Sequence, residues 1–187
     1  MANNISLPLN PCISGWNAVL PSRVPHDNLA DNLNADYLII GGGFAGLSAA
    51  RRLNQLEPTA KIVVLEACDI GEGPAGRNSG FMIDLPHNLA SDDYLGSLEK
   101  DLEQTLINRS AIDFAKNASK EYQMPSEAIE LSGKTNAAAT TKGVKFNSEY
   151  ADHLTKTGEE FKLLGPSEMK EMTGIDYYKN GLWTPGT

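Results

Sequence analysis

The clearest hydrophobic pattern in the 187-residue chain runs through residues 35–66. A short apolar run, Tyr37–Ile40, has the length and composition of a buried parallel strand. From Phe44 the apolar residues take helical spacing, and the helix should end before Pro58, because the residue before a proline disfavours the α region. A second apolar run, Ile62–Leu65, predicts another buried strand. This order of strand, helix and strand predicts a βαβ unit in an α/β fold.

The turn between the first strand and the helix carries glycines at G-x-G-x-x-G spacing, namely Gly41, Gly43 and Gly46. In such a turn the first glycine allows a tight bend, the second lets a pyrophosphate approach the backbone, and the third lets the helix pack on the strand. The helix N-terminus then offers N–H groups and a partial positive charge to the diphosphate. Glu66 follows the second strand, 20 residues after Gly46, where a carboxylate can accept hydrogen bonds from a ribose. The pattern favours a dinucleotide site over the alternative, a glycine-rich turn in another kind of α/β unit.

A long irregular loop is predicted after the second strand, because four glycines and a proline fall within residues 71–80. In this loop Arg77 can pair with a phosphate, and Asn78 and Ser79 can hydrogen-bond to a ring or ribitol edge. The alternative is a glycine-rich surface loop that binds no ligand. The position of the loop directly after the dinucleotide unit favours ligand binding.

The remaining sequence predicts an N-terminal arm and a further set of helices and strands. Residues 1–34 are polar, contain prolines and lack helix or strand periodicity, so they predict an extended surface arm anchored by Trp16 and the Val19–Leu20 pair. The later elements predicted from periodicity and breaker residues are a helical region over 92–122 that Gly96 can divide, two short strands over 129–139, a helix over 142–161, a strand at 163–164, a helix starting near Pro166 and a strand from Gly181. We expect the apolar side of the first of these helical regions to face a core.

Composition and charge narrow the classes of function. Acidic residues outnumber basic ones by 24 to 16, and the formal net charge of −8 argues against a nucleic-acid-binding surface. No apolar run approaches the roughly 18 residues that a membrane-spanning helix needs. The N-terminal sequence lacks the charged and apolar regions of a signal peptide. We therefore expect a cytoplasmic protein without a membrane span.

Cysteine and histidine residues form no metal-binding pattern in the sequence. Cys12 and Cys68 fit no metal motif, and a reducing compartment predicts two free thiols, with a disulfide as the alternative. His26, His87 and His153 are scattered along the chain and give no zinc signature. We expect no metal site.

Three segments together resemble a known family: residues 36–50, which contain the motif glycines, residues 64–67 at the end of the second strand, and residues 71–80, which end in Gly-Arg-Asn-Ser-Gly. They are similar to the N-terminal part of FAD-dependent oxidoreductases of the D-amino-acid oxidase superfamily, and within it to the glycine oxidase, sarcosine oxidase and gamma-glutamylputrescine oxidase group. One departure is Pro74–Ala75, where relatives often carry Ala-Ser, which affects the detailed course of the loop and not its role.

The resemblance implies FAD as the cofactor and assigns positions along it. It places the motif glycines at the pyrophosphate and Glu66 at the adenosine ribose, and it places the Gly-Arg-Asn loop along the inner half of FAD. The cofactor-binding residues predicted in this way are Gly41, Gly43, Phe44, Ala45, Gly46, Glu66, Ala67, Gly76, Arg77, Asn78, Ser79 and Gly80.

The resemblance also implies three parts of the chain and a missing remainder of the fold. Residues 1–34 form the arm, 35–125 the N-terminal part of a Rossmann-type FAD-binding domain, and 126–187 the beginning of a mixed-sheet substrate domain. Only the N-terminal part of the family fold is covered, and the sheet alone would expose an open face and edge. We therefore expect a second polypeptide to supply the rest, either as a separate subunit or as the C-terminal product of cleavage after Thr187.

The activity implied by the resemblance is oxidation of a C–N bond in a small amine or amino acid. A hydride passes from the carbon beside the nitrogen to the flavin, which gives an imine that water hydrolyses. No catalytic residue is assigned. Asp84 and His87 follow the FAD loop and can face the ring or the substrate, but the favoured interpretation is that Asp84 caps a turn and His87 is a loop residue. The alternatives left open are a flavin monooxygenase, an NAD-dependent dehydrogenase and a non-catalytic subunit of a flavoprotein complex.

Overall fold

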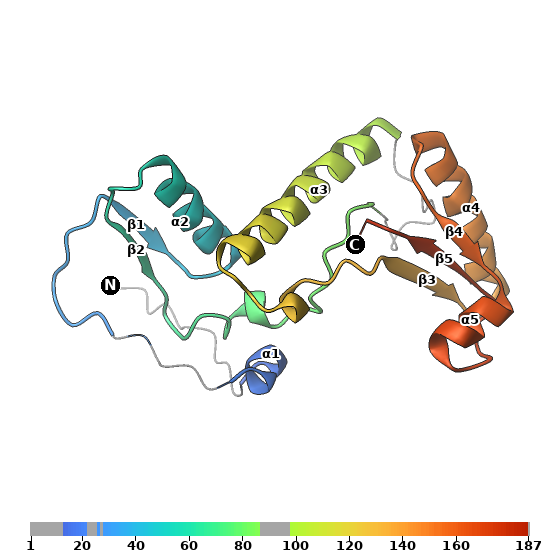
Figure 1. Ribbon diagram of the computed structural model, residues 1–187, viewed down its shortest axis with the longest axis horizontal. Coiled ribbons are helices and arrows are strands. Elements are labelled where there is room, and N and C mark those ends of the chain that lie inside the picture. Colours follow the sequence, from blue (N-terminus) through green and yellow to red (C-terminus); the bar gives the residue numbers. More distant parts are fainter. Residues whose placement is uncertain (1–12, 22–25, 27, 87–97, 187) are drawn as a thin grey trace, which may run out of the picture. The chain divides into compact units, whose positions relative to one another are not determined.

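The computed structural model describes residues 13–21, 26, 28–86 and 98–186 (Figure 1). The chain divides into two compact units, Met1–Gly80 and Phe81–Thr187, called here the first and the second unit. The predictions made for His87 and Gly96 fall outside the described residues. The domain boundaries expected after residues 34 and 125 stay predictions.

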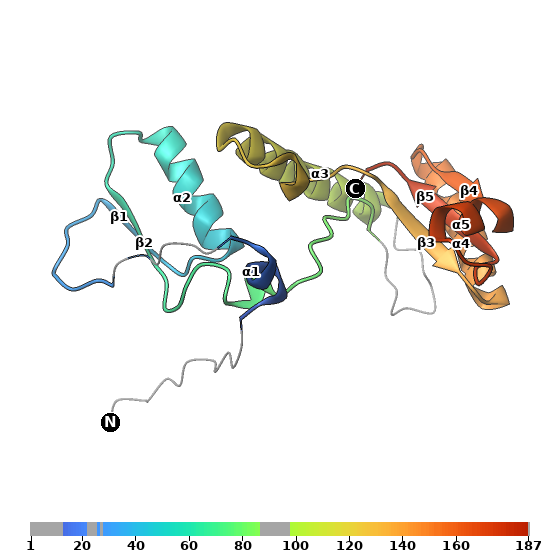
Figure 2. The ribbon, with the colours of Figure 1, turned by 60° about the horizontal axis from the view of Figure 1, so that its bottom comes forward.

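The first unit is built on the predicted βαβ arrangement. β1 (Tyr37–Ile40), α2 (Phe44–Leu56) and β2 (Ile62–Leu65) have the predicted bounds. The two strands pair in parallel over their full length, and α2 packs along the pair (Figure 1 and Figure 2). α2 ends where predicted because Glu57, which precedes Pro58, leaves helical backbone angles, with φ −132° and ψ 72°.

The burial of these strands differs from the prediction. Both strands are predicted to be buried, yet the side chains of Leu38 and Ile40 are 56% and 84% exposed. Ile39, between them, points toward α2 and lies next to Gly46. Because alternate side chains of a strand point to opposite faces, α2 covers one face of the β1–β2 pair, and the described residues of this unit leave the other face open. No apolar side chain is buried among the residues described in the first unit.

The N-terminal arm contains a short helix that the sequence does not predict. α1 (Gly15–Val19) forms because Ser14 caps it, its hydroxyl oxygen accepting a hydrogen bond from the Asn17 N–H at 3.2 Å. Trp16 anchors the arm, as predicted, by donating its indole N–H to a carbonyl oxygen of the loop after β2. The Val19–Leu20 pair does not anchor it, since both side chains are exposed.

The second unit combines a three-stranded antiparallel sheet with helices. Its elements, in chain order, are α3 (Leu98–Glu121), η2 (Ser126–Ala128), β3 (Lys134–Ala138), α4 (Thr141–Thr157), β4 (Lys162–Leu164), α5 (Pro166–Thr173) and β5 (Asn180–Thr184). The strand order is β3–β5–β4, and both pairings are antiparallel. α4 packs against β3 and β5, and α5 packs against β4 and β5. β5 is therefore the central element of this unit.

Helix ends in the second unit follow local sequence signals. α4 begins after Thr140, whose hydroxyl oxygen accepts a hydrogen bond from the Gly143 N–H at 3.1 Å. It ends at Gly158, which has a left-handed backbone with φ 74°. The helix predicted over 142–161 is therefore shorter at its C-terminal end. α5 has Pro166 at its start, as predicted.

Only one of the two short strands predicted over 129–139 is present. β3 covers Lys134–Ala138, whereas residues 129–131 form no strand. Between them Gly133 has φ 80°, and a Cβ at this position would press on the ring of Trp183 in β5. The chain changes direction at Gly133, so strand pairing with β5 begins only after it, at Lys134.

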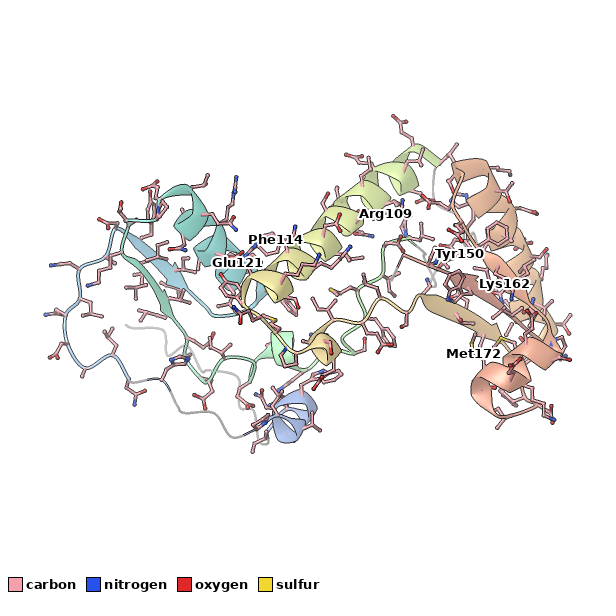
Figure 3. All side chains as sticks on the ribbon, viewed as in Figure 1. Arg109, Phe114, Glu121, Tyr150, Lys162 and Met172 are labelled. Carbon is pink, nitrogen blue, oxygen red and sulfur yellow. The ribbon has the colours of Figure 1, made fainter. Side chains whose placement is uncertain are left out.

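The second unit has a small apolar core. Its buried members, with Phe161 packed against them, are Leu85, Tyr150, Ala151, Leu154 and Leu182. Figure 3 labels Tyr150 on α4 and Arg109 on α3. Full burial of a large apolar side chain contributes about 1.5–3 kcal/mol, so this cluster is the main apolar stabilisation of the unit. The apolar side of α3 contributes less than predicted, since Ile112 is buried but Leu106 and Ile107 are exposed.

Two further features bear on the predictions from composition. None of the helices within the described residues is long and apolar enough to cross a membrane. Cys68 is a free and exposed thiol, as predicted. Cys12 lies outside the described residues.

Candidate functional site

The turn after β1 requires glycine for two different physical reasons. Gly41 has φ 102°, a backbone conformation that L side chains rarely adopt, and its N–H donates to the carbonyl oxygen of Leu65 at 2.7 Å. A Cβ on Gly46 would overlap the carbonyl oxygen of Gly41 and would lie 3.3 Å from Cγ2 of Ile39. The tight bend and the close packing of α2 on the turn therefore both depend on absent side chains.

The N-terminus of α2 is left uncapped. Gly43 is its N-cap residue, with φ −81° and ψ −173°, and no side chain caps the helix. A Cβ built on Gly43 would have the Cβ of Ala75 as its nearest neighbour, at the ordinary contact distance of 3.9 Å. The N–H groups of Phe44 and Ala45, in the first turn, have no acceptor within the helix, and the positive end of the helix dipole lies there. This geometry suits an anion such as a phosphate.

Glu66 presents a fixed carboxylate at the same turn. Its Oε2 accepts a hydrogen bond from the Gly42 N–H at 2.6 Å, and its Oε1 accepts from the N–H groups of Ala67 and Cys68 at 2.9 and 3.2 Å. Hydrogen bonds from Gly42, Cys68 and Ala67 lower the pKa of the Glu66 carboxyl below its ordinary value. The carboxylate is thus ionised, oriented and exposed, and it can accept a further hydrogen bond from a hydroxyl group.

The loop after β2 lies against this turn and is shaped by its own polar groups. A short helix, η1 (Pro74–Gly76), places Ala75 next to Gly43. The side-chain amide of Asn78 donates to the Ala75 carbonyl oxygen at 2.6 Å, and its Oδ1 accepts from the Gly80 N–H at 2.7 Å. Gly80 itself has φ 81°. Asn78 and Gly80 therefore set the course of the loop.

Arg77, predicted to pair with a phosphate, pairs with Glu72 of the same loop. Its Nε donates to the Glu72 carbonyl oxygen at 2.9 Å, and its Nη2 lies 3.4 Å from Oε2 of Glu72. A guanidinium has five N–H donors, so this pairing is compatible with a phosphate contact. A Cβ on Gly76 would overlap the Gly71 carbonyl oxygen, so the bend before Arg77 also needs glycine. Ser79 is exposed.

The predicted cofactor-binding residues thus come together in the first unit, around the turn after β1 and the loop after β2. Sequence reasoning missed the role of Asn17 and Glu72 in holding this loop. The side-chain amide of Asn17 donates to Oε1 of Glu72 at 2.6 Å, across a sequence separation of 55 residues. No spacing rule connects two such positions, so the sequence pattern carries no signal for this contact.

Asp84, in the second unit, has contacts that fit a structural role. Its side chain is buried, its Oδ1 accepts from the Leu85 N–H at 2.8 Å, and its Oδ2 accepts from Nε of Arg109 at 3.0 Å. Arg109 also pairs with Glu159 at 2.6 Å. Glu159 first, and then Asp84, raise the pKa of the Arg109 guanidinium. These contacts favour the interpretation in which Asp84 fixes a turn.

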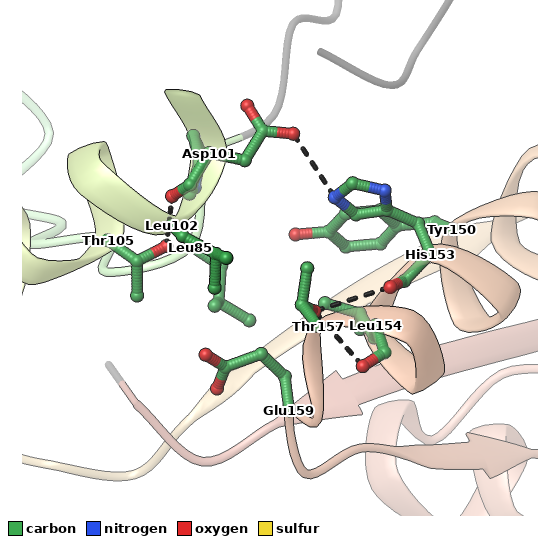
Figure 4. A pocket seen from close by; sticks show the side chains of 10 residues that line it. Leu85, Asp101, Leu102, Thr105, Tyr150, His153, Leu154, Thr157 and Glu159 are labelled. Carbon is green, nitrogen blue, oxygen red and sulfur yellow. Dashed lines mark hydrogen bonds and ion pairs between the residues drawn. The ribbon is translucent and has the colours of Figure 1, made fainter. Parts of the chain in front are cut away.

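The second unit also contains a small cavity between α3 and α4 (Figure 4). At its edge Nε2 of His153 lies 3.1 Å from Oδ2 of Asp101, and the Thr157 hydroxyl donates to the carbonyl oxygens of His153 and Leu154. The volume of about 10 Å³ is near the lower limit for a single water molecule. The cavity is too small for a substrate or cofactor, so the candidate site is the turn in the first unit.

The chain matches a known family and several known oxidoreductases. A family model described as FAD dependent oxidoreductase (DAO) matches residues 36–187. The probable oxidoreductase OrdL of Rhizobium meliloti (strain 1021) is 26% identical over 188 residues, which cover 96% of this chain and 42% of that protein. The gamma-glutamylputrescine oxidoreductase of Escherichia coli (strain K12) is 42% identical over 59 residues, which cover 32% of this chain and 13% of that protein. The chain therefore spans less than half the length of these curated relatives.

Solved structures with the same fold also extend beyond the chain. The glycine oxidase from Bacillus cereus ATCC 14579 matches with a TM-score of 0.53 and 19% identity, over 81% of this chain and 39% of that chain. The L-amino acid deaminase from Proteus myxofaciens matches with a TM-score of 0.56 and 14% identity, over 87% of this chain and 35% of that chain. At these identities the likeness shows the fold alone, and this chain forms part of that fold. Because the family model covers residues 36–187, including the glycine turn and the loop after β2, the chain belongs to the family of FAD-dependent oxidoreductases.

Proposed function

We propose that this chain is the FAD-binding, N-terminal portion of an oxidase or dehydrogenase that acts on C–N bonds of amines or amino acids. The observation that carries the proposal is the uncapped N-terminus of α2 at Gly43, with the fixed carboxylate of Glu66 at the same turn. FAD, when bound, supplies the acceptor for a hydride from the carbon beside the nitrogen, and the imine is then hydrolysed by water. Support for this substrate class comes from relatives and fold neighbours named as a gamma-glutamylputrescine oxidoreductase, a glycine oxidase and an L-amino acid deaminase.

In this proposal the first turn of α2 binds the pyrophosphate. The N–H groups of Phe44 and Ala45 donate to phosphate oxygens, and Gly43 allows the close approach because it has no Cβ. The helix dipole adds a favourable interaction with the negative charge. Gly41 and Gly46 act indirectly, since they hold the turn in the shape that leaves these N–H groups accessible.

Glu66 holds the adenosine ribose in the same proposal. The carboxyl is ionised at neutral pH and can accept hydrogen bonds from ribose hydroxyls, and the backbone hydrogen bonds that lower its pKa keep it ionised at more acidic pH. The backbone N–H of Ala67 binds Oε1 of Glu66 at 2.9 Å and so helps to orient the carboxylate. Ala67 thus acts as a donor that orients the acceptor, the Glu66 carboxylate, at the end of β2.

The loop after β2 lines the inner half of FAD. Gly76, Asn78 and Gly80 fix the course of the backbone, through the close contact and the hydrogen bonds described above. Arg77 supplies positive charge for a phosphate, and Ser79 presents an exposed hydroxyl for a polar edge of the cofactor.

The rest of the active protein is also part of the proposal. Residues 35–125 belong to the FAD-binding domain, residues 126–187 open the substrate domain, and a second polypeptide supplies the remaining fold. The exposed side chains of Leu38 and Ile40 support this, because they leave one face of the β1–β2 pair open. Intact-mass measurement of every chain in the native complex tests it. A lone 20.2 kDa species that is FAD-bound and active would contradict the need for a second polypeptide.

The test of FAD binding is the substitution Gly43→Ala. The added methyl group fits the protein, with 3.9 Å to Ala75, but it stands where a phosphate must approach. We expect normal folding by circular dichroism and loss of most bound flavin, measured by absorbance per protein. Unchanged flavin content in the variant would contradict the proposal.

The structure offers a matched control at the N-cap of α5. Gly165 has nearly the same backbone angles as Gly43, φ −78° and ψ 175°, and similar room, with Glu168 at 3.9 Å. Gly165→Ala therefore carries the same N-cap cost at a helix that has no proposed ligand. The Gly165→Ala variant should retain the flavin content of the wild-type protein. If the wild-type protein itself were colourless, the result would favour an NAD-dependent enzyme.

A further inference from the structure

We propose that α1, through Trp16 and Asn17, braces the loop after β2 and positions Arg77 and Asn78 for the cofactor. This inference rests on the proposed FAD site and adds to it a segment that the family model does not include, since that match starts at residue 36. In this proposal α1 is a positioning element that acts through its contacts with the loop.

α1 meets both ends of the loop. A Cβ built on Gly71, where the loop begins, would lie 3.5 Å from Oδ1 of Asn17. A Cβ built on Gly80, where the loop ends, would lie 3.2 Å from Cζ2 of Trp16. Both glycines have positive φ, 84° and 81°. Neighbouring side chains of one short helix thus contact the two bends that define the loop.

Two hydrogen bonds tie α1 to residues inside the loop. The indole N–H of Trp16 donates to the carbonyl oxygen of Asn78 at 2.7 Å. The side-chain amide of Asn17 donates to Oε1 of Glu72 at 2.6 Å, while Oε2 of Glu72 lies 3.4 Å from Nη2 of Arg77. The Glu72 carboxylate therefore links Asn17 to Arg77, so the orientation of the guanidinium depends on the arm.

The exposure of these groups argues for local positioning over general stabilisation. Trp16 is 50% exposed, so its burial contributes only part of what a core aromatic residue contributes. An open groove remains beside α1, lined by Gly15, Trp16, Val19, Gly76, Arg77 and Asn78. α1 therefore holds the loop from one side, and Arg77 and Asn78 stay accessible from the groove.

The test compares tryptophan substitutions in the FAD-bound protein. Trp16→Phe keeps an aromatic ring but removes the N–H that binds the loop, and we expect the FAD dissociation constant to rise about fivefold. Trp183→Phe is the matched control, because it also removes an indole N–H that donates to a backbone carbonyl oxygen, that of Ser132, at 3.4 Å. The control should bind FAD like wild type.

A second variant tests the link to Arg77. Asn17→Asp replaces the amide donor by a carboxylate that repels Glu72, and we expect FAD affinity to fall about tenfold or more. The visible circular dichroism of bound flavin should change as well, while the melting temperature of the FAD-free protein stays near wild type. A purely structural role of α1 would shift that melting temperature instead.

The possible failures can be told apart. Wild-type protein that binds no FAD overturns the proposed function and the brace together. Wild-type protein that binds FAD, with Trp16→Phe and Asn17→Asp variants of equal affinity and identical flavin spectra, overturns the brace alone.

Discussion

The two compact units of this chain are held together by different interactions. In the first, hydrogen bonds and close backbone packing predominate, and none of its described apolar side chains is buried. In the second, an apolar cluster around Tyr150, Leu154 and Leu182 is buried, with the ion pairs of Arg109 beside it. In the first unit the characteristic residues are glycines that set the backbone shape, whereas in the second unit they are apolar residues that pack into a core.

This difference fits the proposed division of labour. A site that approaches a ligand with bare backbone must leave out the side chains that would fill a core, as Gly41, Gly43 and Gly46 do. Ligand-binding loops are commonly among the less stable parts of a protein, and few buried apolar contacts mark such parts. We therefore expect the first unit to depend on bound cofactor and covering polypeptide more strongly than the second unit does.

The largest effect is expected from truncating the core of the second unit. Leu182 on β5 is fully buried, so Leu182→Ala should lower the free energy of unfolding by about 2–5 kcal/mol. Leu38→Ala, on the open face of β1, should change it by less than about 0.5 kcal/mol in the 187-residue chain. Urea unfolding of both variants measures the two changes in the free energy of unfolding. Equal losses in the two variants would contradict the difference between the units.

A smaller loss is expected from the charged contacts of the same unit. Asp84→Ala leaves the Leu85 N–H and the Arg109 guanidinium without this acceptor and should cost about 1–3 kcal/mol. Glu149→Ala removes a pair with Lys145 at 3.5 Å on the surface of α4 and should cost less than about 0.5 kcal/mol. If both variants unfolded at the same urea concentration, the buried carboxylate would not be a structural centre.

In the first unit the corresponding change is at a glycine. Gly46→Ala places a methyl group against the Gly41 carbonyl oxygen, so the backbone of the turn must shift, and we expect a loss of about 1–3 kcal/mol. Gly43→Ala should have little effect on stability, because its methyl group has room. Thermal unfolding without FAD measures both, and a larger loss for Gly43→Ala would contradict the packing described here.

The smallest effect is a difference in acid sensitivity. The folded-state pKa of Glu66 lies below its ordinary value of 4.5, so its contribution is present above pH 4.5 and is lost as the pH falls through the lowered pKa. Glu66→Gln should remove this part of the stability that is lost in acid.

The pKa of Glu168 in the second unit is lowered first by Lys162 and then by the Gly165 N–H. Because salt screens exposed ion pairs, 1 M NaCl should weaken the Glu168 contribution more than that of Glu66, and an equal salt effect would count against this assignment.

The same contrast explains what the sequence can predict. The strand, turn and helix around Gly41 follow from local rules, and so does the position of Glu66 at the end of β2. α1 was not predicted, because five residues carry no periodicity and only the Ser14 cap marks its start. The contact of Trp16 with Asn78 spans 62 residues, and the sequence gives no signal for the pairing of Arg77 with Glu72. Short-range chemistry is readable from the chain, whereas contacts made by tertiary folding are not.

Helices α2 and α5 both have a glycine as their N-cap residue, but their first turns differ. Both begin at a glycine with almost the same backbone angles. Three residues further on, α5 has Glu168, which folds back and accepts the Gly165 N–H at 2.9 Å, whereas α2 has Gly46. An acidic side chain at this position interacts favourably with the positive end of the dipole of its own helix. A helix without one leaves that end available to a bound anion. Gly46, the third glycine of the motif, therefore also ensures that no side chain at this position occupies the N-terminus of α2.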